Sequence, residues 1–223
     1  MEQLIKKENE IFNILQKFID NGLNFIIVGG YAVSAFKHRF SVDADVMVKS
    51  EDLSKFEQLL DKYKFKKTIT KELENVYSSK FIRYEKDWAS IDLMIDALAS
   101  RTTNASFSFE LISSNSIKKK IIGIEKKIHA KIPIKELLIA MKIHSGRLTD
   151  FRDIAALAKD SNLQLIRQFL FIGDLKVIQE NLHKLNDIVN DKNFVNSFKG
   201  VFLEKKFDID MQQVKRISEL KKQ

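Results

Sequence analysis

The residues Gly29, Gly30, Asp43 and Asp45 are the first in this chain whose types and spacing indicate chemistry. The two aspartates are two positions apart in an apolar stretch, 42–48, that we expect to form a strand, so both carboxylates should share one face. Neighbouring carboxylates repel each other unless one is protonated or a cation lies between them. Because Mg²⁺ takes carboxylate oxygens together with substrate phosphates, this pair predicts a metal site.

The glycines follow a short apolar run, 25–28, that is typical of a buried strand. Without a Cβ atom, Gly29 and Gly30 let the backbone turn sharply and approach a ligand closely. The N-terminus of the short helix expected over 31–36 favours a bound phosphate. A phosphate-binding turn that precedes a metal-binding acidic pair predicts phosphoryl or nucleotidyl transfer.

This order of residues resembles the signature of the DNA polymerase β-like nucleotidyltransferase superfamily, in which a Gly-Gly turn and a short helix precede Asp-x-Asp on the next strand. The stretch 39–45, Arg-Phe-Ser-Val-Asp-Ala-Asp, also resembles the Arg-x-Thr-x-Asp-x-Asp form of the prokaryotic, toxin-like AbiEii branch, with Ser41 where Thr is usual. The resemblance implies an enzyme that moves a nucleoside monophosphate from an NTP to a hydroxyl, with Arg39 and Ser41 at the nucleotide. It also implies two Mg²⁺ ions, or Mn²⁺, held by Asp43, Asp45 and a third carboxylate.

Two aspartates are candidates for this third carboxylate. In the family the third carboxylate comes from a later strand, and Asp92 fits that place because it lies between Ile91 and Leu93 in an apolar run. A carboxylate in such a run is costly unless it has a partner. Asp96, four residues later on the same face of the expected strand, is the other candidate.

A second motif lies within 138–157, where Lys142, Arg147, Asp150 and Asp153 resemble the Ala-Met-Lys…Arg…Asp helical motif of AbiEii-type proteins. Lys142 and Arg147 would neutralise triphosphate charge. Asp150 or Asp153 would orient these cations or contact the nucleotide. Thr149 and Arg152 depart from the family's usual pattern, and the alternative interpretation is an ordinary cluster of ion pairs on a helix surface.

Apolar periodicity and turn residues predict an α+β fold. We expect a nucleotidyltransferase domain over 1–133, with a small mixed sheet and flanking helices, and a helical C-terminal domain over 134–223. The expected helices cover 4–19, 50–63, 134–144 and 150–158, and the pattern is helical from 163 onward. Strands are expected at 65–69, 80–85, 89–96, 109–112, 117–124 and 127–132, with a loop at 98–108.

Composition limits the class of protein. The chain has 223 residues, a net charge of +8 and no cysteine, which excludes disulfides and thiolate metal sites and favours polyanionic partners. It has no apolar run of the length that spans a membrane and no apolar signal-peptide core, so we expect a cytoplasmic protein.

The sequence leaves the acceptor open among a tRNA end, a protein hydroxyl and a small molecule such as an aminoglycoside, and it leaves the NTP and the oligomeric state open. The resemblance to the toxin-like branch extends the hypothesis to a toxin of a toxin–antitoxin pair. The alternatives are a catalytically silent nucleotide- or RNA-binding module, or a component of such a pair that acts by binding a protein partner.

Overall fold

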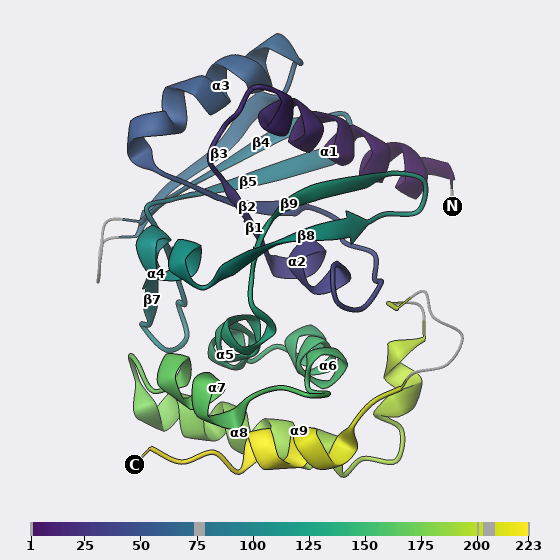
Figure 1. The fold of residues 1–223 in the computed structure, drawn as a ribbon, viewed down its shortest axis with the longest axis vertical. Coiled ribbons are helices and arrows are strands. Elements are labelled where there is room, and N and C mark those ends of the chain that lie inside the picture. Colours follow the sequence, from purple (N-terminus) through teal and green to yellow (C-terminus); the bar gives the residue numbers. More distant parts are fainter. Residues whose placement is uncertain (1, 74–78, 200, 203–207, 223) are drawn as a thin grey trace. The chain divides into compact units, whose positions relative to one another are not determined.

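The computed structural model of the chain describes residues 2–73, 79–199, 201–202 and 208–222 (Figure 1). The chain divides into two compact units. Unit 1 comprises Met1–Leu98 and Phe107–Pro133, and unit 2 comprises Ala99–Ser106 and Ile134–Gln223. No described helix is both long enough and apolar enough to cross a bilayer.

Unit 1 is built on a seven-stranded mixed sheet with the order β3-β4-β5-β2-β1-β9-β8. β2 pairs with β5 and β1 pairs with β9 in parallel, and the other neighbouring strands are antiparallel. The mixed sheet with flanking helices that the sequence predicts is therefore confirmed. The strands are β1 (Ile26–Val28), β2 (Ala44–Val48), β3 (Lys66–Leu73), β4 (Ser79–Lys86), β5 (Ala89–Ile95), β8 (Ser116–Ile122) and β9 (Lys127–Pro133).

Two amphipathic helices, α1 (Glu2–Asp20) and α3 (Leu53–Lys62), lie side by side along one face of this sheet (Figure 1). Apolar side chains at helical spacing face the sheet, and their burial is the main source of stability for such helices. Phe18 of α1 meets Phe56 of α3 edge to face with ring centroids 4.9 Å apart. The buried core residues of α1 are Ile11, Phe12, Ile14, Leu15 and Phe18.

Three sequence predictions are corrected. The strand expected over 42–48 begins only at Ala44, so Asp43 precedes it, and Val42 is 54% exposed. The stretch 109–112 is not a strand but part of helix α4 (Phe109–Ser114), because the Ser108 hydroxyl accepts a hydrogen bond from the Leu111 N–H at 3.1 Å and caps the helix.

The stretch 98–108, expected as a loop, contributes to a two-stranded ribbon of β6 (Ala97–Ala99) and β7 (Ser106–Ser108). The chain passes between unit 1 and unit 2 within this ribbon.

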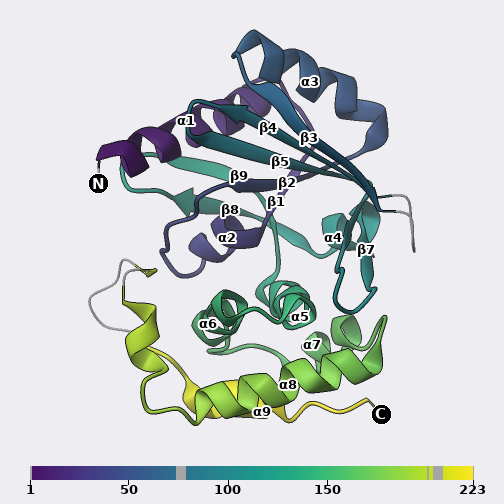
Figure 2. The same ribbon diagram turned by 180° about the vertical axis from the view of Figure 1, so that it is seen from behind.

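In unit 2, α5 (Lys135–Ser145) is the central helix and packs against α6, α7 and α8 (Figure 2). Every residue of α5 from Glu136 to His144 is buried, so α5 is surrounded by protein. Gly146 ends α5 with a φ of 65°, a conformation that glycine adopts without steric cost. The other helices are α6 (Leu148–Leu157), α7 (Leu163–Leu170), α8 (Leu175–Val189), the 3-10 helix η2 (Val195–Phe198) and α9 (Met211–Ser218).

Candidate active site

Three charged residues lie in one row across the centre of the sheet. Asp45 on β2 is the register partner of Asp92 on β5, and Asp92 is in turn the register partner of Arg83 on β4. Register partners on adjacent strands share one face, about 5 Å apart. The strand pairing therefore places Asp45 and Asp92 on neighbouring strands, although they are far apart in sequence.

Arg83 and Asp92 form a bidentate ion pair. Arg83 Nε donates to Asp92 Oδ1 and Arg83 Nη2 donates to Asp92 Oδ2, both at 2.7 Å. Asp92 is only 4% exposed, and its burial raises the pKa of the carboxyl group while Arg83 acts against that rise. The hydrogen bonds to Asp92 raise the pKa of Arg83 above its ordinary value, so the guanidinium stays charged.

Asp43 lies just before β2 and is reached by the same guanidinium group. Arg83 Nη2 is 3.4 Å from Asp43 Oδ2, a longer contact than either bond to Asp92. The side chains of Arg83 and Asp43 are 28% and 30% exposed, whereas that of Asp92 is 5% exposed. Arg83 therefore joins a buried carboxylate to one that solvent can reach.

The glycine turn forms the other side of this group. Helix α2 (Gly29–Ser34) begins directly after β1. Gly29 has a φ of 62°, and a Cβ atom there would lie 1.8 Å from Oδ2 of Asp45, so no other residue fits beside that carboxylate without displacement. A Cβ atom at Gly30 would lie 2.3 Å from the Ser41 hydroxyl oxygen and 3.4 Å from Arg39 Nη2.

The segment before β2 is held by two hydrogen bonds that involve Ser41. The Ser41 hydroxyl donates to the carbonyl oxygen of Asp43 at 3.2 Å, and the Tyr31 hydroxyl donates to the carbonyl oxygen of Ser41 at 3.1 Å. The structure therefore brings the predicted unit 1 residues together in one place. They are Gly29, Gly30, Arg39, Ser41, Asp43, Asp45 and Asp92.

Asp96 lies outside this group. It follows the end of β5, where Ile95 pairs with Val48 at the far end of β2 from Asp45. Asp96 has a φ of 63°, its carboxylate accepts a hydrogen bond from the Ser50 N–H at 2.8 Å, and its own N–H donates to the Val48 carbonyl. Asp96 thus connects the ends of two strands to the start of the next helix, which is a structural role.

The donor chemistry of the acid cluster suits Mg²⁺, since all three candidates are carboxylates at or next to adjacent register positions. The arrangement of the side chains, however, does not suit Mg²⁺. Both oxygens of Asp92 are bonded to Arg83, and Asp45 packs against Gly29. Within the described residues, no three His, Cys, Asp or Glu side chains are arranged to hold a metal ion. As it stands, the cluster does not form a three-carboxylate cation site.

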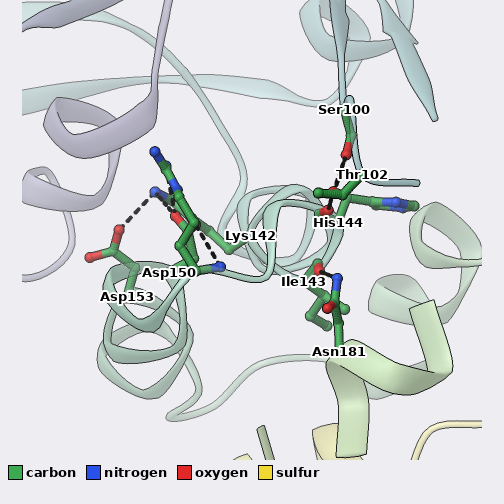
Figure 3. A network of polar contacts seen from close by, with 9 residues as sticks. Ser100, Thr102, Lys142, Ile143, His144, Asp150, Asp153 and Asn181 are labelled. Carbon is green, nitrogen blue, oxygen red and sulfur yellow. Dashed lines mark hydrogen bonds and ion pairs between the residues drawn. The ribbon is translucent and has the colours of Figure 1, made fainter. Parts of the chain in front are cut away.

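The second predicted group lies in unit 2 and is a buried ion-pair network (Figure 3). Lys142 Nζ is 2.9 Å from Asp150 Oδ1 and 2.8 Å from Asp153 Oδ2. Burial alone would lower the pKa of Lys142, but the two carboxylates outweigh that effect and raise it. Because Lys142 is 8% exposed and both aspartates are fully buried, its ammonium group serves to neutralise them.

Arg147 is the member of this network that solvent can reach. Its side chain is 70% exposed, and its Nε donates to Asp150 Oδ2 at 2.7 Å. Burial would raise the pKa of Asp150, but Lys142 and Arg147 outweigh it and lower the pKa to about 2. Asp150 also accepts from the Arg147 backbone N–H at 3.3 Å and so caps α6. Of the two predicted phosphate-binding cations of unit 2, only Arg147 is accessible.

His144 points to the side of α5 opposite Lys142 (Figure 3). Its Nδ1 is 2.7 Å from the Thr103 hydroxyl oxygen, and its carbonyl oxygen accepts hydrogen bonds from the hydroxyls of Ser100 and Thr102. Burial lowers the pKa of His144 to about 4, so the ring is neutral at pH 7. These contacts tie the segment 99–106 to the helices of unit 2.

Sequence reasoning missed Arg83. The signal that would have found it is the short turn at Asp87 and Trp88, which pairs Lys86 with Ala89. Once that pairing is fixed, antiparallel register places Arg83 directly opposite Asp92. The pairing also supplies the partner that a carboxylate within an apolar strand requires.

No protein-family model and no curated protein sequence matches this chain. Solved structures do resemble it. A crystal structure of ANT(2")-Ia in complex with adenylyl-2"-tobramycin has a TM-score of 0.53 and 13% identity, over 76% of this chain and 95% of that one. A solution structure of the antibiotic-resistance factor ANT(2'')-Ia has a TM-score of 0.53 and 14% identity, over 72% of this chain and 87% of that one.

A lincomycin-bound crystal structure of the lincosamide antibiotic adenylyltransferase LnuA has a TM-score of 0.47 and 19% identity, over 69% of this chain and 98% of that one. At such identities the likeness to the two ANT(2'')-Ia structures establishes the fold alone. The α+β fold class that the sequence predicts is thereby confirmed, and the chain shares its fold with these two structures.

Proposed function

We propose that this chain is a nucleotidyltransferase that moves a nucleoside monophosphate from an NTP to a hydroxyl group of a small molecule and releases pyrophosphate. The observation that carries the proposal is the single group formed by the glycine turn, Asp43, Asp45 and Asp92. The chain shares its fold with ANT(2'')-Ia, whose crystal structure holds adenylyl-2"-tobramycin.

In this reaction the acceptor hydroxyl oxygen attacks the α-phosphorus, the bond to the β-phosphate oxygen breaks, and the hydroxyl proton must leave. We assign the proton to Asp92, because burial raises the pKa of this carboxyl group and a raised pKa suits a general base. Gly29 and Gly30 would let the backbone approach the phosphates closely. Arg39 and Ser41, which meet at Gly30, would contact the triphosphate from the same side.

As they are arranged here, Asp43, Asp45 and Asp92 do not hold a metal ion; Mg²⁺ or Mn²⁺, which would neutralise phosphate charge, would be held by these carboxylates only after their side chains rearrange. For Asp92 this requires that Arg83 release its carboxylate. Within unit 2, Arg147 is the cation that an anion can reach, since its guanidinium is exposed and is oriented by Asp150. Lys142 and Asp153 would support Arg147 through the buried network and would not touch the nucleotide.

The experiment that tests the proposal is incubation with each α-labelled NTP and Mg²⁺ in the presence of three separate acceptor pools. One pool contains small polyhydroxylated molecules that include aminoglycosides, one contains total RNA and one contains protein. We expect label on a small molecule. Label on RNA or protein would keep the reaction and correct the acceptor, and no label in any pool would contradict the proposal.

A second function, nucleotide binding without transfer, is favoured by one observation. Arg83 bonds both oxygens of Asp92, the residue that would take the proton. A silent binding module would bind NTP in equilibrium dialysis, would leave every pool unlabelled and would keep its NTP affinity in an Asp92→Asn variant.

The resemblance of 39–45 to the toxin-like branch extends the proposal to a toxin of a toxin–antitoxin pair. Induced expression tests this extension. Growth arrest on expression of the wild type, but not of an Asp45→Asn variant, would support the extension. Unaffected growth on expression of the wild type would contradict it.

A further inference from the structure

Arg83 occupies the position within the acid cluster where a cation is expected. Its guanidinium bonds both oxygens of Asp92 at 2.7 Å and reaches Asp43 at 3.4 Å. These are two of the three carboxylates whose spacing predicts a divalent cation site. A structural ion pair for a buried carboxylate would be complete with Asp92 alone, and the further reach to the half-exposed Asp43 is not needed for it.

We propose that Arg83 is the internal counter-ion of this cluster and that Arg83 and a divalent cation compete for Asp92. The inference rests on the proposed function only in taking Asp43, Asp45 and Asp92 as the cation ligands. Arg83 is then a positioning residue, because it acts through Asp92 and need not contact the substrate.

The physical basis is charge. One guanidinium group contacts two carboxylates here, since Arg83 lies 2.7 Å from Asp92 and 3.4 Å from Asp43. A buried carboxylate must be neutralised, and either a guanidinium or a metal ion can do so. Both cannot hold the same two oxygens of Asp92 in the bidentate geometry seen here. A cation bound through Asp92 must displace Arg83. The free energy of the Arg83–Asp92 ion pair is therefore subtracted from the free energy of cation binding.

The accessibility of Arg83 makes this exchange feasible. Its side chain is 28% exposed, whereas the Lys142 side chain, in the other ion-pair network, is 10% exposed and lies between two fully buried aspartates. A released Arg83 side chain can enter solvent or contact an anionic ligand. Lys142 has no such alternative without local unfolding.

The test measures binding of Mn²⁺ by electron paramagnetic resonance in the wild type, Arg83→Gln, Asp92→Asn and the double variant. We expect Arg83→Gln to bind Mn²⁺ at least about 5-fold more tightly than the wild type. We expect this gain to vanish when Asp92→Asn is also present, because the competition takes place at Asp92. Lys66→Gln, which removes an exposed charge from β3 of the same sheet, controls for net charge and should change the affinity less than 2-fold.

An Arg83→Gln affinity equal to or weaker than that of the wild type would overturn the inference, as would a gain that persists in the Asp92→Asn background. If Arg83→Gln does not fold by circular dichroism, Arg83→Lys replaces it. Arg83→Lys keeps the charge but loses the bidentate geometry, so the expected gain is smaller but still above that of Lys66→Gln.

Because no nucleotide is present, the result separates the two proposals. Competition for Mn²⁺ without NTP transfer would leave the inference standing and contradict the proposed function. NTP transfer without competition for Mn²⁺ would support the proposed function and overturn the inference.

Discussion

Two ion-pair clusters, one in each unit, use the same residue types in opposite ways. In unit 2, Lys142 and Arg147 face Asp150 and Asp153, so the charges balance, and three of the four residues are buried. In unit 1, Arg83 contacts both Asp92 and Asp43, and Arg83 and Asp43 remain partly exposed. A fully buried cluster fixes structure, whereas a cluster that solvent reaches can take up a ligand.

The largest effect should come from the unit 1 cluster and should fall on activity. Asp92→Asn removes the proposed proton acceptor, so we expect the rate of NTP transfer to fall about 10³-fold while the fold persists. Asp96→Asn is the matched control, since asparagine tolerates the positive φ of residue 96 and Asp96 lies outside the cluster. Equal losses of rate in the two variants would contradict the assignment of Asp92.

The next effect should fall on stability and come from the unit 2 cluster. Lys142→Met leaves Asp150 and Asp153 buried without their ammonium partner, which should lower the free energy of unfolding by about 3–5 kcal/mol in urea denaturation. Lys176→Met, at an exposed position of α8, should change it by less than about 0.5 kcal/mol. A Lys142→Met protein as stable as the Lys176→Met protein would contradict the stabilising role that we assign to the unit 2 cluster.

A third effect concerns pH and His144. The pKa of His144 is about 4 in the folded state and 6.5 in its unperturbed state, so the unfolded chain binds more protons between these values. Stability should therefore fall as pH drops from about 6.5 towards 4, by about 2 kcal/mol between pH 7 and pH 5. Asp150, with a pKa of about 2, loses its contribution only at lower pH, below its unperturbed value of 3.8.

Denaturant midpoints at pH 7 and pH 5 measure this effect. His144→Gln should flatten the pH dependence, and His183→Gln, at an exposed position of α8, should leave it as in the wild type. An unchanged slope in His144→Gln would show that another group is responsible.

The smallest expected effect is a difference in stability between alanine variants at Gly29, in the glycine turn, and at Gly22. Gly22 and Gly29 have φ values of 67° and 62°, so alanine is strained at both positions, by about 1 kcal/mol. Only at Gly29 does the new Cβ atom meet Asp45, whereas nothing lies within 4 Å at Gly22. Gly29→Ala should therefore destabilise the fold by about 1–2 kcal/mol more than Gly22→Ala, and should also impair transfer. Equal stabilities would show that Asp45 moves aside without cost.

The sequence was sufficient to predict the mixed sheet and the group around Gly29 because these depend on local patterns. The apolar run before Gly29 directly indicates strand β1, and the alternation of apolar and acidic residues around Asp45 directly indicates strand β2. The start of β2 after Asp43 was missed because the boundaries of an element are harder to predict from sequence than its type. The helix at Phe109–Ser114 was missed because a short apolar run is typical of a strand and of a buried helix alike. In the second case the cap at Ser108 decided the outcome.

The partners of the charged residues were harder to predict because they depend on register and tertiary packing. The pairing of Arg83 with Asp92 follows from the position of one turn, and the burial of Lys142 follows from the packing of helices around α5. Neither is visible in the local sequence of the residue concerned.

The most direct test of the account is NTP transfer by the wild type and by a variant that carries both Asp43→Asn and Asp45→Asn. Both proteins would be assayed with the same α-labelled NTP, Mg²⁺ and acceptor pools, after circular dichroism has shown that both are folded. We expect label on an acceptor hydroxyl with the wild type and none above background with the variant. Transfer by the variant at the wild-type rate would contradict it.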